Sequence, residues 1–297
     1  MPAGSFRLKT KVGGRDTRSA YALLLPVLAF FLIFQYYPIL KSVALSFFEY
    51  GLLMPRTPWV GLENYVRQFQ DPLFLSALGN TLVFVVVAVA VGVVLALGGA
   101  VLVEKTGRWA RLYRMLYFIP VITSLLATSM VFRWLYASNG LLNFVLTYVG
   151  LEPQAWLLSE ALALPSLIAL TIWKNLGFDL ILFAAALQAI PPDYYEASSL
   201  EGASTWDDFR YITLPQVRPI VLLVCITAVI RSFQVFTIVL AMTQGGPINA
   251  SRTIVYHIYE QGIQYDEMGY ASAAAVILLI IVAMMTYGQM RLGRESA

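Results

Sequence analysis

Three charged side chains, Lys174, Asp179 and Arg231, lie inside long apolar stretches of this sequence. A charge within a membrane-crossing segment costs roughly 2.5–3.5 kcal/mol, so it usually faces a cavity or a partner. Lys174 and Asp179 are five residues apart, which turns an ideal helix by about 140° net, so they do not share one helix face. We expect one of them to pair with Arg231 or with Arg133. Two hypotheses stay open: an ion pair that fixes helix packing, and a polar lining for a solute path.

Other polar and aromatic side chains surround these charges in both stretches. Flat apolar faces combined with directional hydrogen-bonding groups suit a polyhydroxylated solute. Gly177, between the two charges of the first stretch, allows close helix packing or a kink. The candidates for lining a solute path are Trp173, Asn175, Asp179, Arg231, Ser232 and Gln234.

Cysteine and histidine, which many enzymes use as nucleophiles, bases or metal ligands, occur only once each. Cys225 is the single cysteine and His257 the single histidine, which excludes a disulfide framework and sites built from several cysteines or histidines. No nucleophile–base or carboxylate-pair constellation stands out, and metals held only by carboxylates stay formally possible. No G-x-x-x-x-G-K-[ST] phosphate loop occurs, so ATP cannot bind here in the P-loop manner. We therefore predict no catalytic residue, no metal site and no cofactor bound by this chain.

A polar segment at 191–219 has the local signals of two short helices joined by a turn. Asp193 and Glu196 have the spacing of a capping box, and Gly202 can end that first helix. Ser204 or Thr205 can cap a second helix, whose positive end Asp207 and Asp208 would stabilise. Pro215 and Pro219 are expected to stop the second helix before the next apolar stretch.

The elements that hold these residues are membrane-spanning helices. Of 297 residues, 59% are hydrophobic and only 12% charged, whereas a soluble globular chain carries about 25% charged residues. Runs of about 20 apolar residues predict spans, and these are too long for barrel strands. The first span is expected to be retained, since its apolar run exceeds that of a signal peptide. The six predicted spans are 20–40, 81–103, 116–136, 161–190, 220–242 and 269–287, with short surface helices in the outer loops.

Lysine and arginine placement predicts the orientation of this all-α membrane protein. With the N-terminus inside, 13 of the 20 basic residues fall in inner segments and 3 in outer ones, so both termini should be cytoplasmic. The predicted organisation is a basic cytoplasmic segment 1–19, a first helix and outer loop 20–75, a core 76–290 with five spans, and a tail 291–297.

The spacing within 191–219 resembles the EAA signature of inner-membrane subunits of binding-protein-dependent ABC importers. That pattern is E-A-A, three residues, G, nine residues, then I-x-L-P, and every spacing is kept here. The sequence departs from it at Ser198, usually Ala, and at Glu201, usually Asp. WVGLENY, TQGGP and MGYASAAA resemble the carbohydrate-importing branch, and the maltose- and glycerol-phosphate-type subunit in particular. The residues that this resemblance assigns to ATPase coupling are Glu196, Ala197, Ser198, Gly202, Ala203, Ile212, Leu214 and Pro215.

The resemblance implies a type I importer permease fold in a bacterial inner membrane and a division of labour among several chains. A second, homologous permease subunit would complete the solute path, and two copies of a cytoplasmic ATPase would bind ATP and Mg. An extracytoplasmic solute-binding protein would deliver a sugar or sugar-like solute, and no nucleic acid is involved. The two stretches around Asp179 and Arg231 line the path in maltose-type subunits. The alternative hypothesis is a stand-alone secondary transporter or channel in which Lys174, Asp179 and Arg231 couple ions.

Overall fold

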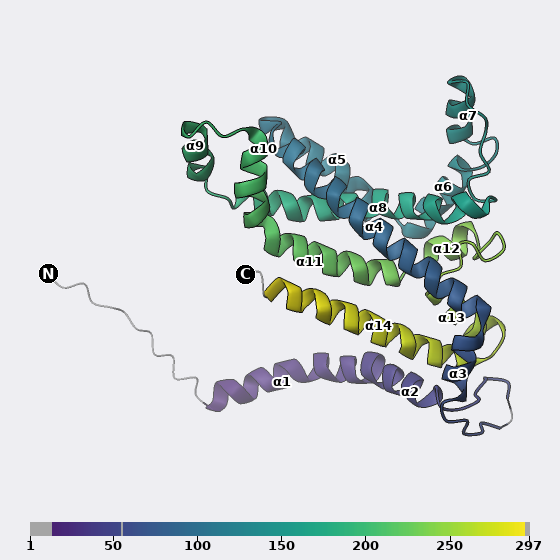
Figure 1. Cartoon of the computed structure of the whole chain (residues 1–297). Coiled ribbons are helices and arrows are strands. Elements are labelled where there is room, and N and C mark those ends of the chain that lie inside the picture. The colour runs from purple at the N-terminus through teal and green to yellow at the C-terminus, as the bar shows by residue number, and fades with distance from the viewer. Residues whose placement is uncertain (1–13, 55, 295–297) are drawn as a thin grey trace.

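The computed structural model describes residues 14–54 and 56–294, and this part of the chain is a bundle of helices (Figure 1). Most of the predicted basic segment 1–19 and the last three residues lie outside the described residues. The helices are α1 (Gly14–Phe31), α2 (Tyr37–Leu45), α3 (Glu63–Gln70), α4 (Pro72–Glu104), α5 (Ala110–Ile122), α6 (Leu125–Leu135), α7 (Leu141–Tyr148), α8 (Glu160–Gln188), α9 (Asp193–Leu200), α10 (Thr205–Asp207), α11 (Leu214–Phe233), α12 (Thr237–Met242), α13 (Ile254–Tyr259) and α14 (Met268–Arg294).

Six of the helical segments match the six predicted spans. Five are long and apolar enough to cross a membrane: 21–45, which joins α1 to α2 through a widened π-helical turn, then α4, α8, 205–233 and α14. The sixth is a pair, α5 and α6, whose axes differ by 96°. The predicted number of spans is therefore confirmed when the bent pair counts as one.

The third predicted span, 116–136, is broken rather than straight. Thr123 leaves the helix with an extended backbone, and Ser124 caps α6 by accepting a hydrogen bond from the Ala127 amide at 3.5 Å. Pro120, three residues before the break, cannot donate to the helical ladder. A proline followed by a capping serine thus ends one helix and begins another inside a single apolar run.

The fifth predicted span, 220–242, is wrong at both ends. The helix begins earlier, because α10, a π-helical turn at 208–213 and α11 follow one another without interruption. Pro215 lies in the first turn of α11, where its missing amide hydrogen is tolerated, and Pro219 is carried inside the helix. The helix also ends earlier, at Phe233, and α12 is a separate short helix beyond it. The expectation that the two prolines stop the helix is therefore not met.

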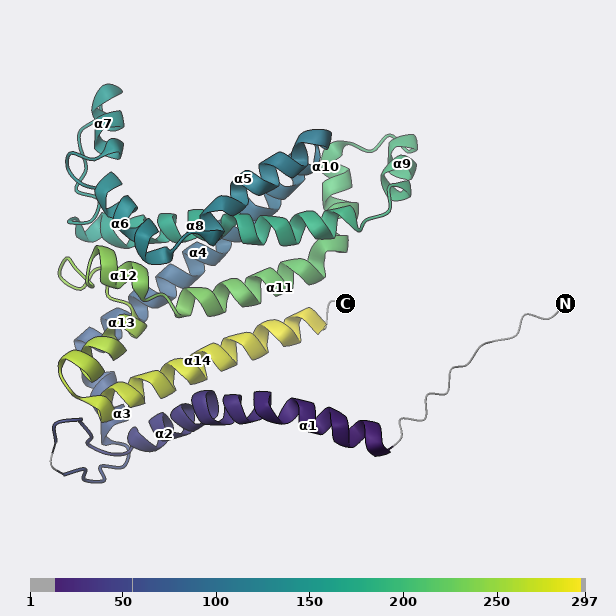
Figure 2. The same ribbon diagram turned by 180° about the vertical axis from the view of Figure 1, so that it is seen from behind.

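The spans differ in how deeply they are buried. Half of the most apolar part of α8 is buried inside the described protein, and none of the corresponding part of α1–α2 is. Side chains of α4, α8 and α11 form the central packing, with Phe183, Leu180 and Val224 fully buried. α1 and α2 lie along the edge of the bundle, where α2 packs against α14 (Figures 1 and 2). α8 is thus the element best placed to position buried polar groups.

The short helices gather at the two ends of the bundle. α3, α7, α12 and α13 lie at one end, and α9, α10 and the end of α14 lie at the other (Figures 1 and 2). At the first end, Asn64 donates to the carbonyl groups of Ser46 and Phe48 at 2.9 Å, and Asp266 accepts from the Leu52 and Leu53 amides. The predicted short helices in the loops are confirmed there.

Candidate functional site

The segment between α8 and α11 forms a helical elbow at one end of the bundle, made of α9, the turn at 201–204 and α10. Gly202 has φ +80°, in the left-handed region that favours glycine. The Ala203 amide donates to the Ser198 carbonyl and the Gly202 amide to Ser199, both at 3.2 Å, which closes α9 in the manner of a Schellman motif. The predicted helix–glycine turn–helix is therefore confirmed.

Capping within the elbow is as predicted at α10 but not at α9. Ser204 and Asp207 form a reciprocal capping box, in which the Ser204 amide donates to the Asp207 carboxylate at 3.0 Å. At α9, however, the capping residue is Pro192, and Asp193 is already the first helical residue, so the predicted Asp193–Glu196 capping box is wrong. Glu196 is instead an exposed acid in the first turn of α9.

Two side-chain contacts hold α9 to the helix that leads into the membrane. The Ser198 hydroxyl donates to Asp208 Oδ1 at 2.5 Å, and the hydroxyl groups of Tyr195 and Thr213 are 3.0 Å apart. Because the π-helical turn continues into α11, a force applied to α9 passes directly to a span. Of the other predicted coupling residues, Ala197 lies in α9, Gly202 and Ala203 in the turn, Ile212 in the π-helical turn, and Leu214 and Pro215 at the start of α11.

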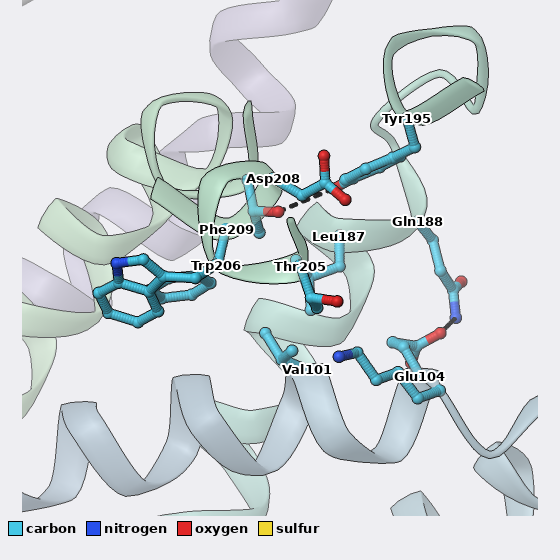
Figure 3. A pocket seen from close by; sticks show the side chains of 11 residues that line it. Val101, Glu104, Leu187, Gln188, Tyr195, Thr205, Trp206, Asp208 and Phe209 are labelled. Atoms are coloured by element: carbon cyan, nitrogen blue, oxygen red, sulfur yellow. Dashed lines mark hydrogen bonds between the residues drawn. The ribbon is translucent and has the colours of Figure 1, made fainter. Parts of the chain in front are cut away.

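A pocket of about 620 Å³ separates the elbow from the ends of α4 and α8 (Figure 3). Val101 and Glu104 of α4 line one side of it, and Trp206 and Phe209 line the other. Outside the pocket, Leu200 is 89% exposed at the tip of α9. The elbow therefore projects from the bundle with an exposed apolar tip, as a surface that docks against another chain would.

A second group of polar residues lies between α4, α8 and α11. Arg231 donates to both carboxylate oxygens of Asp179, at 2.7 and 2.9 Å, so the predicted pairing of one α8 charge with Arg231 is confirmed. Asn175, Asp179, Arg231 and Ser232 line one small cavity of about 20 Å³, which has room for a water molecule but not for a sugar ring.

Lys174 has a different environment from Asp179. Its ammonium group reaches the broken end of α5, where it donates to the carbonyl groups of Pro120 and Thr123 and to the Thr123 hydroxyl. These carbonyl groups lie where the helical ladder stops, so the lysine satisfies acceptors that the break leaves free. Beside it, Gly177 lets α8 approach the Tyr117 carbonyl so closely that a Cβ would lie 1.8 Å from its oxygen.

The remaining predicted path residues lie apart from this cavity. The ring of Trp173 packs against Phe132 of α6, with centroids 5.0 Å apart. Gln234 follows the last residue of α11 and is exposed. The structure thus brings four of the six candidates together and leaves Trp173 and Gln234 outside the group.

Sequence reasoning missed a polar core at the end with α13. Arg252 forms a buried ion pair with Glu260, and Asn80 donates to the carbonyl groups of Asn249 and Arg252 at 2.8 and 3.1 Å. A spacing of eight residues does not predict that Arg252 and Glu260 form an ion pair, because the chain between them changes from a loop to the helix α13.

Comparison with known proteins identifies the chain's relatives. Residues 109–292, which include the elbow and α11, match a family described as the binding-protein-dependent transport system inner membrane component. This chain belongs to that family. As a member of it, the chain is a membrane component of a transport system and not an enzyme.

Two relatives of this permease are similar over almost their whole length. The probable ABC transporter permease YurN of Bacillus subtilis is 35% identical over 279 residues, which cover 91% of this chain and 94% of the relative. The lactose transport system permease LacF of Rhizobium radiobacter is 31% identical, with 93% and 94% covered.

A solved structure confirms the type I ABC permease fold. The chain matches a bacterial ABC transporter involved in the import of the acidic polysaccharide alginate, with a TM-score of 0.83, 25% identity, and 95% and 96% of the two chains covered.

Proposed function

We propose that this permease forms half of the solute path of an ATP-driven importer for a sugar or sugar-like compound. The segment from Glu196 to Pro215, which includes most of the elbow and the first turn of α11, is its contact with a separate ATPase. The observation that carries the proposal is the elbow itself. The residues of the EAA pattern form the projecting helix α9, the glycine turn and the start of the helix that continues into a membrane span, and the Ser198–Asp208 hydrogen bond joins α9 to that helix.

The partners follow from this division of labour. A second, homologous permease subunit supplies the other half of the path, and two ATPase copies hold ATP and Mg. An extracytoplasmic binding protein delivers the solute, in keeping with the family's description. Arg210 and Arg218, which follow α10, and Lys105 and Arg108, which lie between α4 and α5, favour a cytoplasmic position for this end, in a bacterial inner membrane.

The solute class rests on the relatives and on the polar group in the spans. Relatives are described as transport permeases for lactose, for arabinooligosaccharides and for trehalose and maltose. Asn175, Arg231 and Ser232 would offer hydrogen bonds to hydroxyl groups once the Asp179–Arg231 pair opens. Family membership favours this function over a stand-alone transporter that couples ions.

Reversing the charge of Glu196, an exposed acid in α9, tests the coupling proposal. We expect Glu196→Lys to leave the spans inserted but to weaken co-purification of the ATPase, or its stimulation by solute in reconstituted vesicles. Gly202→Asp should act in the same way, because a side chain at φ +80° costs about 1 kcal/mol or more and tilts α9.

Glu152→Lys is the matched control, since it reverses an exposed charge in the loop after α7, at the other end of the bundle. Wild-type association and wild-type stimulation in both elbow variants would show that the elbow is not the coupling element.

A further inference from the structure

A cavity of about 430 Å³ opens at the end of the bundle opposite to the elbow. Its walls are the end of α6, the segment 155–158 that follows α7, and the turn 243–247 that follows α12. Small-molecule sites have volumes of about 300–1,000 Å³, so this cavity is large enough for a ligand. The central cavity at Asp179, by contrast, has room only for a water molecule in this conformation.

Two aromatic side chains in this outer pocket are held rigidly. Trp156 donates from its indole nitrogen to Asn143 Oδ1 at 3.1 Å, and its ring lies 5.9 Å from the ring of Tyr136. The Tyr136 hydroxyl donates in turn to the Ser166 carbonyl at 3.1 Å. The wall is therefore fixed before any ligand arrives, which lowers the entropic cost of binding.

The aromatic wall continues toward the membrane-spanning part of α8. From Tyr136 the next ring is Phe132, at 6.0 Å, and from Phe132 the next is Trp173, at 5.0 Å. A row of four rings thus connects the outer pocket with Trp173, the predicted path residue that lies apart from the central cavity.

Polar groups complete the pocket. The Arg133 guanidinium donates one hydrogen bond to the Ala241 carbonyl at 3.4 Å, and a guanidinium carries five N–H donors in all. Ser138 contributes a hydroxyl group, and the exposed Gln244 an amide at the turn after α12. The pocket therefore offers an aromatic face together with several directional donors and acceptors.

We propose that the outer pocket is a saccharide-binding site that receives one or two sugar rings before the central path opens. A ring stacks on Trp156, and Arg133 and Gln244 bind its hydroxyl groups. The row of rings through Phe132 to Trp173 supplies the next apolar faces toward the membrane. This proposal rests on the proposed function of the permease as a sugar importer subunit.

Saturation-transfer NMR on the complete transporter complex in nanodiscs tests the proposal, with maltose, lactose, trehalose and arabinobiose as probes. We expect saturation transfer to ring protons of at least one disaccharide. Trp156→Ala should weaken its apparent affinity by about fivefold to tenfold, the worth of one aromatic contact. Trp156→Phe should restore most of the affinity, and Gln244→Ala should weaken it without disturbing the aromatic wall.

Trp134→Ala is the matched control, because Trp134 lies on α6 next to the pocket residue Arg133 but is 60% exposed and does not line the pocket. The proposal is wrong if none of the four disaccharides gives saturation transfer, or if Trp156→Ala and Gln244→Ala bind as the wild type does. It is also wrong if Trp156→Ala abolishes docking of the solute-binding protein while saccharide transfer is unchanged, since the pocket is then a protein contact. Co-purification of the ATPase, measured on the same samples, reports the importer function separately.

Discussion

Lys174 and Asp179 of α8 have different partners although they are only five residues apart. Asp179 faces α11 and pairs with Arg231, whereas Lys174 faces α5 and binds carbonyl groups at its broken end. The helical turn between them places the two side chains toward different neighbours, as their spacing predicted. Lys174 therefore supports the bend between α5 and α6, and Asp179 with Arg231 lines the central cavity.

Asp179→Ala is expected to lower the yield of folded complex, because Arg231 loses its carboxylate. Breaking a buried pair costs about 3–5 kcal/mol, and we expect the lower end because the Arg231 side chain is 31% exposed. Replacing both residues, by Asp179→Leu with Arg231→Met, should recover most of the yield. The measurements are size-exclusion chromatography and solute uptake. Normal assembly with reduced uptake would assign the pair to the solute path, and normal values of both would dismiss either role.

His257 is expected to make the stability of the protein depend on pH. It is fully buried between Phe74 and Tyr270, and burial lowers its pKa to about 4, with a further contribution from Arg252 that Asp71 and Glu260 oppose. The unfolded state, with a histidine pKa of about 6.5, binds more protons than the folded state below that pH. Stability is thus greatest above about pH 6.5 and falls as the pH approaches 4.

Thermal unfolding of the detergent-solubilised protein, followed between about pH 7 and pH 5, measures this dependence. His257→Phe keeps an aromatic ring of similar size and removes the titrating group. Equal loss of thermal midpoint in the wild type and in His257→Phe would assign the pH dependence to other groups.

Among the elements, the spans and the elbow were predictable because their signals are local. Hydropathy marks each apolar run, and Gly202, Ser204 and Asp207 have conformational preferences that do not need the rest of the fold. The bend between α5 and α6 was not predicted, since an apolar run has the same hydropathy whether it is straight or folded back. Pro120 and Ser124 bracket the bend, but its support comes from Lys174, 51 residues further along the chain than Thr123. Such a contact depends on tertiary packing.

The close approach of α5 and α8 at Gly177 should tolerate no side chain. A Cβ there would lie 1.8 Å from the Tyr117 carbonyl oxygen, so Gly177→Ala must push the helices apart and should lower both the folded yield and the thermal midpoint. Gly98→Ala in α4 is the control, because no described atom beyond its own stretch of helix lies within 4 Å of the added carbon. That change should stabilise the helix by up to about 1 kcal/mol. A Gly177→Ala protein as stable as Gly98→Ala would contradict the packing argument.

At the scale of the whole molecule, the two ends of the bundle carry different elements, and this difference bears on which end faces the cytoplasm. The elbow and the end of α14 lie at one end of the bundle, and α3, α7, α12 and α13 lie at the other (Figure 2). The basic residues between α4 and α5 belong to the first end as well, because α4 and α5 both run to it. The positive-inside rule predicts a cytoplasmic position for this end, which the proposed contact between the elbow and an ATPase requires.

Reporter fusions test this orientation directly. Fusions at Ala110, Thr205 and the last residue, Ala297, should report a cytoplasmic position, and fusions at Gly150 and Val255 an external one. The physical reason is the 13-to-3 division of basic residues between the two sides, since lysine and arginine near span ends are retained inside.

The bend at Thr123 makes the Ala110 and Gly150 pair of fusions the most informative, because α5 and α6 cross the membrane only if the bent pair acts as one span. If the two fusions reported the same side, the bent pair would be a re-entrant segment. An external signal at Thr205 would remove the elbow from the reach of any cytoplasmic ATPase and the coupling proposal with it.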